Sequence, residues 1–311
     1  MGRETRRNLA HDRVRVLPSS WAALTLILAV LAPRPGSAQH QSGAQQQSGA
    51  KMSPSVPAGE NVLRVCADPD NLPSTNRNGE GFDNKIAALL AKELGDSLAY
   101  VWWPQRRGFI RNTLRSRECD LVLGLPIGYD PVLSTKPYYR STYYLVYATS
   151  RQPSLTSLDD SALKRLRIGV NLIGDDYAHT PPVHALLARG ISANVVGYNS
   201  FYGEDHHPGE IIAAVDRGDI DVAIAWGPMA GYFAKRATVP LTLVPLRDDK
   251  VSGMPFVFDI GIGVRRSDRD LKARLDEIVD RLRPAIVGIL EEYHVPTVTW
   301  PAATTTAGDK R

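Results

Sequence analysis

Strand-like and helix-like segments alternate along most of this chain, and that alternation restricts the fold more than any other feature of the sequence. Apolar, β-rich runs at Val62–Ala67, Leu98–Trp102 and Asp120–Leu125 are separated by segments with helical spacing at about 83–94 and 108–117. Asp83 is placed to cap the first of these helices. Strands joined by helices in this order form mostly parallel sheets that helices cover. The sequence therefore predicts an α/β fold.

A second strand and helix series begins at residue 167 and predicts a second lobe. Its strands are expected at 167–170, 194–197 and 221–226, and its helices at about 182–189 and 210–216. Because the series starts afresh, we place a boundary before it.

The last part of the chain is predicted to return to the first lobe. A strand at Phe258–Val264 precedes a long helical stretch at Asp268–Tyr293, which Pro284 should split or kink. We therefore expect a two-lobed α/β fold, with two mixed sheets flanked by helices and a cleft between the lobes. The expected divisions are a signal peptide at 1–38, a flexible linker at 39–60, lobe 1 at 61–148 and 251–298, lobe 2 at 149–250, and a disordered tail at 299–311.

The first residues have the composition of an export signal. Several arginines precede an apolar run from Trp21 to Ala32, and the small residues Gly36-Ser37-Ala38 follow it. The apolar run is too short to cross roughly 30 Å of hydrocarbon. We expect a periplasmic protein, cleaved near Ala38, with no stable membrane insertion.

The net charge of the mature chain argues against nucleic acid as a partner. The whole sequence carries a formal charge of +4, and residues 1–38 hold six arginines and two acids, so their removal brings the charge to zero. Nucleic acids and anionic membranes need a surplus of basic side chains on the protein surface.

Two cysteines, Cys66 and Cys119, would reach an oxidising compartment. The first lies late in its predicted strand and the second lies just before its own. Because a strand rises about 3.3 Å per residue, that offset can exceed the Cα separation that a disulfide allows. A disulfide and two buried thiols both remain open.

Several motifs resemble the family 3 solute-binding proteins. Gly79-Glu80-Gly81-Phe82-Asp83 before a helix is the first of them. A narrower resemblance, to the quinoprotein-dehydrogenase-associated branch (the MxaJ/XoxJ type), rests on four segments in order: Val65–Pro73, Trp102–Phe109, Lys136–Tyr143 and Ala225–Pro228. The family resemblance implies the two-lobed type II periplasmic binding protein fold. The narrower resemblance implies an accessory role beside a periplasmic methanol or alcohol dehydrogenase that uses pyrroloquinoline quinone, and beside its cytochrome c.

The chain departs from the amino-acid binders of the wider family. They use an arginine after the third strand of lobe 1 to pair with the ligand carboxylate, but no arginine lies between Arg117 and Arg140. Asp175 and Asp176 stand where those binders have a Gly/Thr turn, and two carboxylates would repel an anionic ligand. Import of an amino acid is therefore disfavoured.

Candidate binding residues come from the ends of strands, from aromatic and arginine clusters and from the crossovers. Each has a structural alternative, such as an Asx turn around Pro69, a solvated arginine face or hinge packing by the indole. The candidates for ligand or partner binding are Asp68, Asp70, Asn71, Trp103, Arg106, Arg107, Tyr138, Tyr139, Arg140, Asp175, Asp176 and Trp226.

No sequence motif for catalysis is present, and we expect neither a bound metal nor a cofactor. The leading hypothesis is a binding protein that docks the dehydrogenase and aids its assembly or activation. The alternative is the binding subunit of an importer for a small solute other than an amino acid. A dehydratase-like enzyme with a cleft acid is a remote third.

Overall fold

The computed structural model describes residues 61–151, 154–173, 178–199 and 207–299. The expected signal peptide and linker, nearly all of the expected tail, and Asp175 and Asp176 lie outside the described residues.

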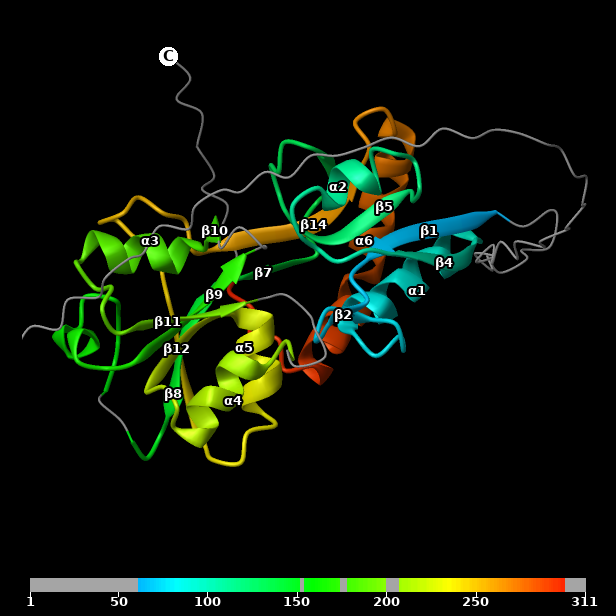
Figure 1. The fold of residues 1–311 in the computed structure, drawn as a ribbon. Helices are drawn as coiled ribbons and strands as arrows, with labels where there is room; N and C mark the ends of the chain where they lie inside the picture. Colours follow the sequence, from blue (N-terminus) through cyan, green and yellow to red (C-terminus); the bar gives the residue numbers. More distant parts are fainter. Residues whose placement is uncertain (1–60, 152–153, 174–177, 200–206, 300–311) are drawn as a thin grey trace, which may run out of the picture. The chain divides into compact units, whose positions relative to one another are not determined.

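The first sheet is mixed and carries the return strand inside it (Figure 1). Its order is β4-β1-β5-β14-β6, and β7 also pairs with β14. The strands β4 and β5 flank β1 in parallel, whereas β14 runs antiparallel to its neighbours. The members are β1 (Val62–Ala67), β4 (Ser97–Trp102), β5 (Leu121–Pro126), β6 (Leu133–Ser134), β7 (Tyr139–Ser141) and β14 (Phe258–Val264).

The second sheet has the order β10-β9-β12-β8-β13, with β11 paired to β9. It is also mixed, because β9 runs parallel to β11 and β12 while β8 is antiparallel to β12 and β13. Its strands are β8 (Tyr143–Ala148), β9 (Ile168–Ile173), β10 (Ala178–His179), β11 (Val195–Asn199), β12 (Val222–Trp226) and β13 (Leu241–Pro245). A short hairpin, β2 (Asp70–Asn71) with β3 (Thr75–Asn76), follows β1.

Helices cover both sheets. The first sheet packs against α1 (Phe82–Leu94) and α6 (Arg269–Glu292), which lie side by side (Figure 1). The second sheet separates two apolar clusters, one with α3 (Pro181–Ala188) and one with α4 (Glu210–Arg217) and α5 (Gly227–Ala234). Alternation along β8 explains the two clusters, since Leu145 enters the first while its neighbours Tyr144 and Val146 enter the second. The short elements are α2 (Phe109–Asn112) and a 3₁₀ turn at Ser161–Lys164.

The first crossing between the sheets differs from the prediction. The sequence placed Tyr143–Ala148 at the end of lobe 1, but β8 pairs with β12 and β13 of the second sheet. The chain therefore crosses at Thr142, whose buried hydroxyl donates to the Leu246 carbonyl of the other crossing at 2.6 Å. A strand's local pattern does not identify its partner, and that is why the boundary was predicted too late.

One helix prediction was wrong in extent. The predicted helix at 108–117 is regular only over Phe109–Asn112, because wider turns follow it and Arg117 adopts φ 62°. The helical stretch predicted at 268–293 has nearly the predicted extent, but it is one continuous helix, α6, and Pro284 lies inside it without splitting it. Pro284 is exposed, and so is Asp280, whose carbonyl the proline leaves without a helical donor, so water can hydrate that carbonyl.

Among the described residues, no helix has the length and apolar character needed to cross a membrane.

Candidate functional site

A pocket of about 160 Å³ opens at the carboxyl ends of β1 and β5. Its wall includes Asp68 and Asn71 after β1, Gly124 within β5 and Trp226 at the end of β12. Parallel strands end at the same edge of a sheet, and ligands of open α/β sheets bind at that edge. The pocket therefore lies where the strand order predicts a binding site.

Asp68 is buried and holds the loops around the pocket. One carboxylate oxygen accepts the Asp70 backbone N–H at 2.9 Å, and the other accepts the Gln105 backbone N–H at 2.5 Å. Burial raises the pKa of Asp68, and the two backbone donors partly oppose that shift. Both oxygens are thus engaged by the protein itself.

Asp83 is a second buried acid in the pocket wall, at 3% exposure. Its Oδ1 accepts the Tyr138 hydroxyl at 2.8 Å, and the Tyr138 oxygen accepts the Gly124 backbone N–H at 2.9 Å. Burial raises the pKa of Asp83 to about 7, and the hydrogen bond from Tyr138 opposes part of that shift. The protonation state of Asp83 therefore changes near neutral pH.

Aromatic side chains form much of the remaining wall. Tyr139 is buried, packs edge-on against Tyr138 with ring centroids 5.1 Å apart, and receives a hydrogen bond from the Trp226 side chain. The ring of Trp226 in turn packs edge-on against the ring of Tyr143, with the ring centroids 5.3 Å apart. Ring-to-ring contacts of this kind fix the orientation of both side chains.

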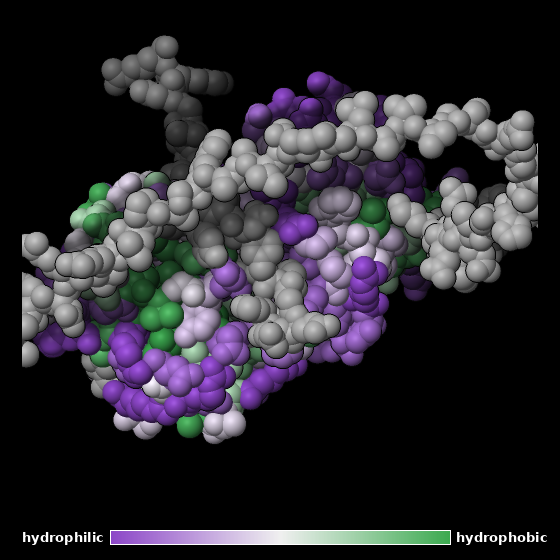
Figure 2. Space-filling model, in the orientation of Figure 1, coloured by the Kyte–Doolittle hydropathy of each residue, from purple (hydrophilic) through white to green (hydrophobic). Residues whose placement is uncertain are grey.

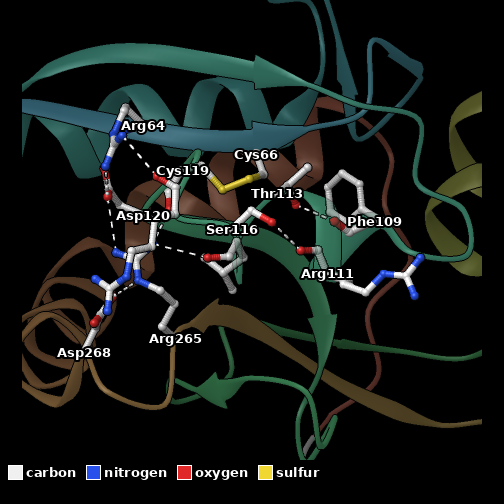
Figure 3. The surroundings of a disulfide bond; sticks show 12 residues. Arg64, Cys66, Phe109, Arg111, Thr113, Ser116, Cys119, Asp120, Arg265 and Asp268 are labelled. Carbon is white, nitrogen blue, oxygen red and sulfur yellow. Dashed lines mark hydrogen bonds and ion pairs between the residues drawn. A yellow bond between two sulfur atoms is a disulfide. The ribbon is translucent and has the colours of Figure 1, made fainter.

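Cys66 and Cys119 form a disulfide bond with a Cα separation of 5.5 Å (Figure 3). The rise of a strand does not separate the two cysteines, because Cys119 lies before β5 and not in an extended strand. The disulfide is buried against Phe109, Ile110 and Leu114. Figure 3 also shows Arg64 and Arg265 directed toward Asp120, with nitrogen–oxygen distances of 2.8 and 3.4 Å.

The structure brings Asp68, Asn71, Tyr139 and Trp226 together in the pocket wall, and it places the other described candidates elsewhere. Tyr138 is buried behind the pocket, and Asp70 is exposed beside it.

The remaining candidates lie on two other segments. Trp103 packs partly buried against the disulfide cluster, followed by the exposed Arg106 and Arg107. Arg140 on β7 forms an ion pair with Asp259, with 3.8 Å between the guanidinium nitrogen and the carboxylate oxygen. These residues do not share one site.

An arginine-rich face lies near α2. Residues 106–117 contain five arginines and no acid, and all five are exposed. Two of them, Arg115 and Arg117, line a hollow of about 270 Å³ with Arg265 and Arg266. Figure 2 shows hydrophilic residues gathered where β14 turns into α6, beside this hollow.

Sequence analysis missed Asp83 as a pocket residue. It assigned Asp83 to the cap of α1, but the N-cap is Gly81 and Asp83 lies inside the first turn. The signal was present, since Asp83 is three, four and seven residues before Ile86, Ala87 and Leu90, all of which are fully buried. That spacing puts Asp83 on the buried face of the helix.

Within the described part of the chain, no three His, Cys, Asp or Glu side chains are grouped so that they could hold a metal ion.

Comparison with known proteins identifies the family, although no family model matches the chain. The chain is 29% identical over 289 residues to protein MoxJ of Methylorubrum extorquens, which covers 89% of this chain and 93% of MoxJ. The crystal structure of the periplasmic binding protein XoxJ from Methylobacterium extorquens AM1 is 37% identical, with a TM-score of 0.63 and coverage of 76% of this chain and 100% of XoxJ. The chain belongs to the MxaJ/XoxJ type of periplasmic solute-binding proteins.

The MxaJ/XoxJ assignment confirms the predicted family and the two-lobed type II fold. The crystal structure of MxaJ from Methlophaga aminisulfidivorans MPT is 25% identical, with a TM-score of 0.67 and coverage of 76% of this chain and 100% of MxaJ. XoxJ is named as a binding protein. The chain is accordingly a periplasmic binding protein.

Proposed function

We propose that this protein is an accessory binding protein of a periplasmic methanol or alcohol dehydrogenase that uses pyrroloquinoline quinone. It holds the dehydrogenase, or a segment or ligand of it, at the cleft between its lobes and aids its assembly or activation. The observation that carries the proposal is the 37% identity to XoxJ along the whole of that chain.

The chemistry of the pocket supports a role other than import of amino acids. Among the described residues, its wall contains Asp68 and Asp83 and no Arg or Lys. An amino-acid carboxylate needs a cationic partner, which Arg supplies by paired hydrogen bonds. The acidic wall would repel that carboxylate.

The arginine-rich face supports docking of a second protein. Among the described residues, no ion pair joins Arg111, Arg115 or Arg117 to a carboxylate, although Arg64 and Arg265 nearby are paired. Exposed guanidinium groups that are not already paired can bind the carboxylates of a partner and speed its association. We assign this face to contact with an acidic surface of the dehydrogenase.

Docking can be measured with purified proteins. We expect the mature chain to bind its dehydrogenase in the apo or holo form, with the affinity falling as salt rises. Combined Arg111→Glu, Arg115→Glu and Arg117→Glu should weaken binding by roughly tenfold or more, and mainly through the association rate. Surface-based kinetics at two salt concentrations would measure this.

The matched control is charge reversal at Lys164 and Arg165, which are exposed in the second lobe and form no ion pair within the described residues. That variant should bind normally. Absence of binding by the wild-type chain to both forms of the dehydrogenase would contradict the proposed function. An equal loss in both variants would contradict only the assigned face.

The pocket favours one second candidate, the binding subunit of an importer for a small solute other than an amino acid. A tightly bound solute recovered from a protein that binds no dehydrogenase would support that candidate.

A further inference from the structure

The pocket wall combines negative charge with aromatic rings. Within the described residues it holds two carboxylates, four aromatic side chains and no basic side chain; these are Asp68, Asp83, Tyr100, Phe109, Tyr139 and Trp226. We propose that the pocket binds a small organic ammonium cation, with Asp83 as its counter-ion and the rings of Tyr139 and Trp226 as its walls. The inference concerns the pocket itself and does not depend on docking of a dehydrogenase.

Asp83 has an oxygen to offer a ligand. Its Oδ1 is engaged by Tyr138, whereas no hydrogen bond from a described residue reaches Oδ2. A buried carboxylate without a counter-charge is unfavourable, and a cation in the pocket would remove that penalty. Protonation of Asp83 near neutral pH, when the pocket holds no cation, agrees with this reading.

Asp68 contributes charge, and each of its oxygens already accepts one hydrogen bond. The donors are the backbone N–H groups of Asp70 and Gln105. It therefore adds to the negative potential of the pocket, whereas Asp83 makes the direct contact.

The aromatic rings suit the same class of ligand. The face of an aromatic ring is negative, and alkylated ammonium groups bind to such faces. The ring of Tyr139 packs against the rings of Phe82 and Tyr138, with centroid distances of 6.1 and 5.1 Å. The ring of Trp226 packs against Phe258, with the centroids 5.9 Å apart. The walls are therefore in place before a ligand enters.

The volume limits the ligand to a few heavy atoms. The pocket holds about 160 Å³, close to the roughly 150 Å³ of an engineered cavity that accepts benzene. Sites for drug-sized ligands begin at about 300 Å³. Tetramethylammonium and choline are suitable probes of this size.

Asp83 is the pocket group whose pKa burial raises to about 7, within the range from pH 6 to 8. The hydroxyls around it belong to Tyr100, Tyr138 and Tyr139, and burial raises the pKa of each above its ordinary value, so they stay neutral. On α6, Glu292 and Arg281 pair with Lys85 and Glu93 of α1. The remaining carboxyl in the pocket wall is Asp68, whose pKa burial also raises, while the hydrogen bonds from the two backbone donors oppose that shift.

The test is calorimetric titration of the protein in phosphate buffer with tetramethylammonium, choline and dimethylbutanol, the neutral carbon isostere of choline. We expect both cations to bind and dimethylbutanol to bind at least roughly tenfold more weakly. Asp83→Asn should weaken the cations roughly tenfold or more and leave dimethylbutanol unchanged. Asp270→Asn, an exposed acid on α6 outside the pocket, is the matched control and should bind as the wild type does.

Two further measurements keep the proposal testable if Asp83→Asn does not fold. The wild type should bind cations more tightly at pH 8 than at pH 6, and Trp226→Leu should weaken the cations more than the neutral isostere. Three outcomes would overturn the proposal: no heat with either cation, equal binding of choline and dimethylbutanol, or cation binding that Asp83→Asn leaves unchanged. Docking of the dehydrogenase is measured separately, so each proposal can fail without the other.

Discussion

Burial of Asp83 makes the free energy of unfolding depend on pH. The pKa of this carboxyl rises from its ordinary 3.8 to about 7 in the folded protein. Between these values the unfolded chain loses the proton while the folded chain keeps it, so the stability that Asp83 contributes falls as the pH rises from about 4 to 7. The full difference is on the order of 4 kcal/mol.

We expect Asp83→Asn to stabilise the protein at pH 8 relative to the wild type and to change it little at pH 4.5. The amide keeps an oxygen for the Tyr138 hydroxyl and removes the titrating group. Urea unfolding at the two pH values would measure the effect, with Asp270→Asn as the control. A constant difference between Asp83→Asn and the wild type would show that Asp83 does not titrate in this range.

Pocket residues could be predicted from the sequence where their position after a strand determines that they lie at the edge of the sheet. Asp68 and Asn71 follow a strand, and the ends of parallel strands meet at one edge. Asp83 was misassigned because an acid at a helix start has an ordinary explanation as a cap. In the folded protein Asp83 is buried against Tyr138, which lies 55 residues further along the chain, so the local sequence pattern does not predict this contact.

At the scale of elements, the start of α1 is packed against backbone. A Cβ added to Gly81 would lie 2.1 Å from the Ser74 carbonyl oxygen. The next two N–H groups, of Phe82 and Asp83, donate to the carbonyls of Pro73 and Ser74 at 2.8 and 2.9 Å. These contacts hold the acid-bearing turn of α1 against the pocket loop.

Gly81→Ala should therefore lower the free energy of unfolding by about 1–3 kcal/mol, because the backbone must move. Gly288→Ala in α6 is the matched change, since nothing lies within 4 Å of its added Cβ. That variant should raise stability by about 0.5–1 kcal/mol through helix propensity. Equal effects in chemical denaturation would contradict the packing at Gly81.

Whole elements were predictable to different degrees. The return strand matches its predicted range, Phe258–Val264, because a β-rich run that ends at the polar residues Arg265 and Arg266 is a local signal. The sheet to which β8 belongs depends on pairing with β12, which lies about 80 residues further along the chain. Long-range pairing of this kind leaves no mark within the strand itself.

At the scale of the molecule, the disulfide closes a segment that contains α1, β4 and α2. Cys66 and Cys119 are 53 residues apart. A loop of that length loses entropy in the unfolded chain worth roughly 4 kcal/mol when it is closed. We expect the double variant Cys66→Ala and Cys119→Ala to lose up to that much stability.

Unfolding of the wild type with a thiol reductant should reproduce most of the loss, and the reductant should not affect the double variant. Denaturation curves with and without reductant would measure this. Full stability of the reduced wild type would show that packing against Phe109 and Leu114 holds the segment without the covalent bond.

The position of β14 within the first sheet has a consequence for biogenesis. It pairs with β5 on one side and with β6 and β7 on the other, so the sheet cannot be completed until residues 258–264 are available. During synthesis, the amino-terminal strands therefore keep unpaired edges until the whole second sheet has been synthesised. The first lobe therefore begins to be synthesised first but completes its sheet last. A chain truncated before β14 would expose an unpaired edge of β5.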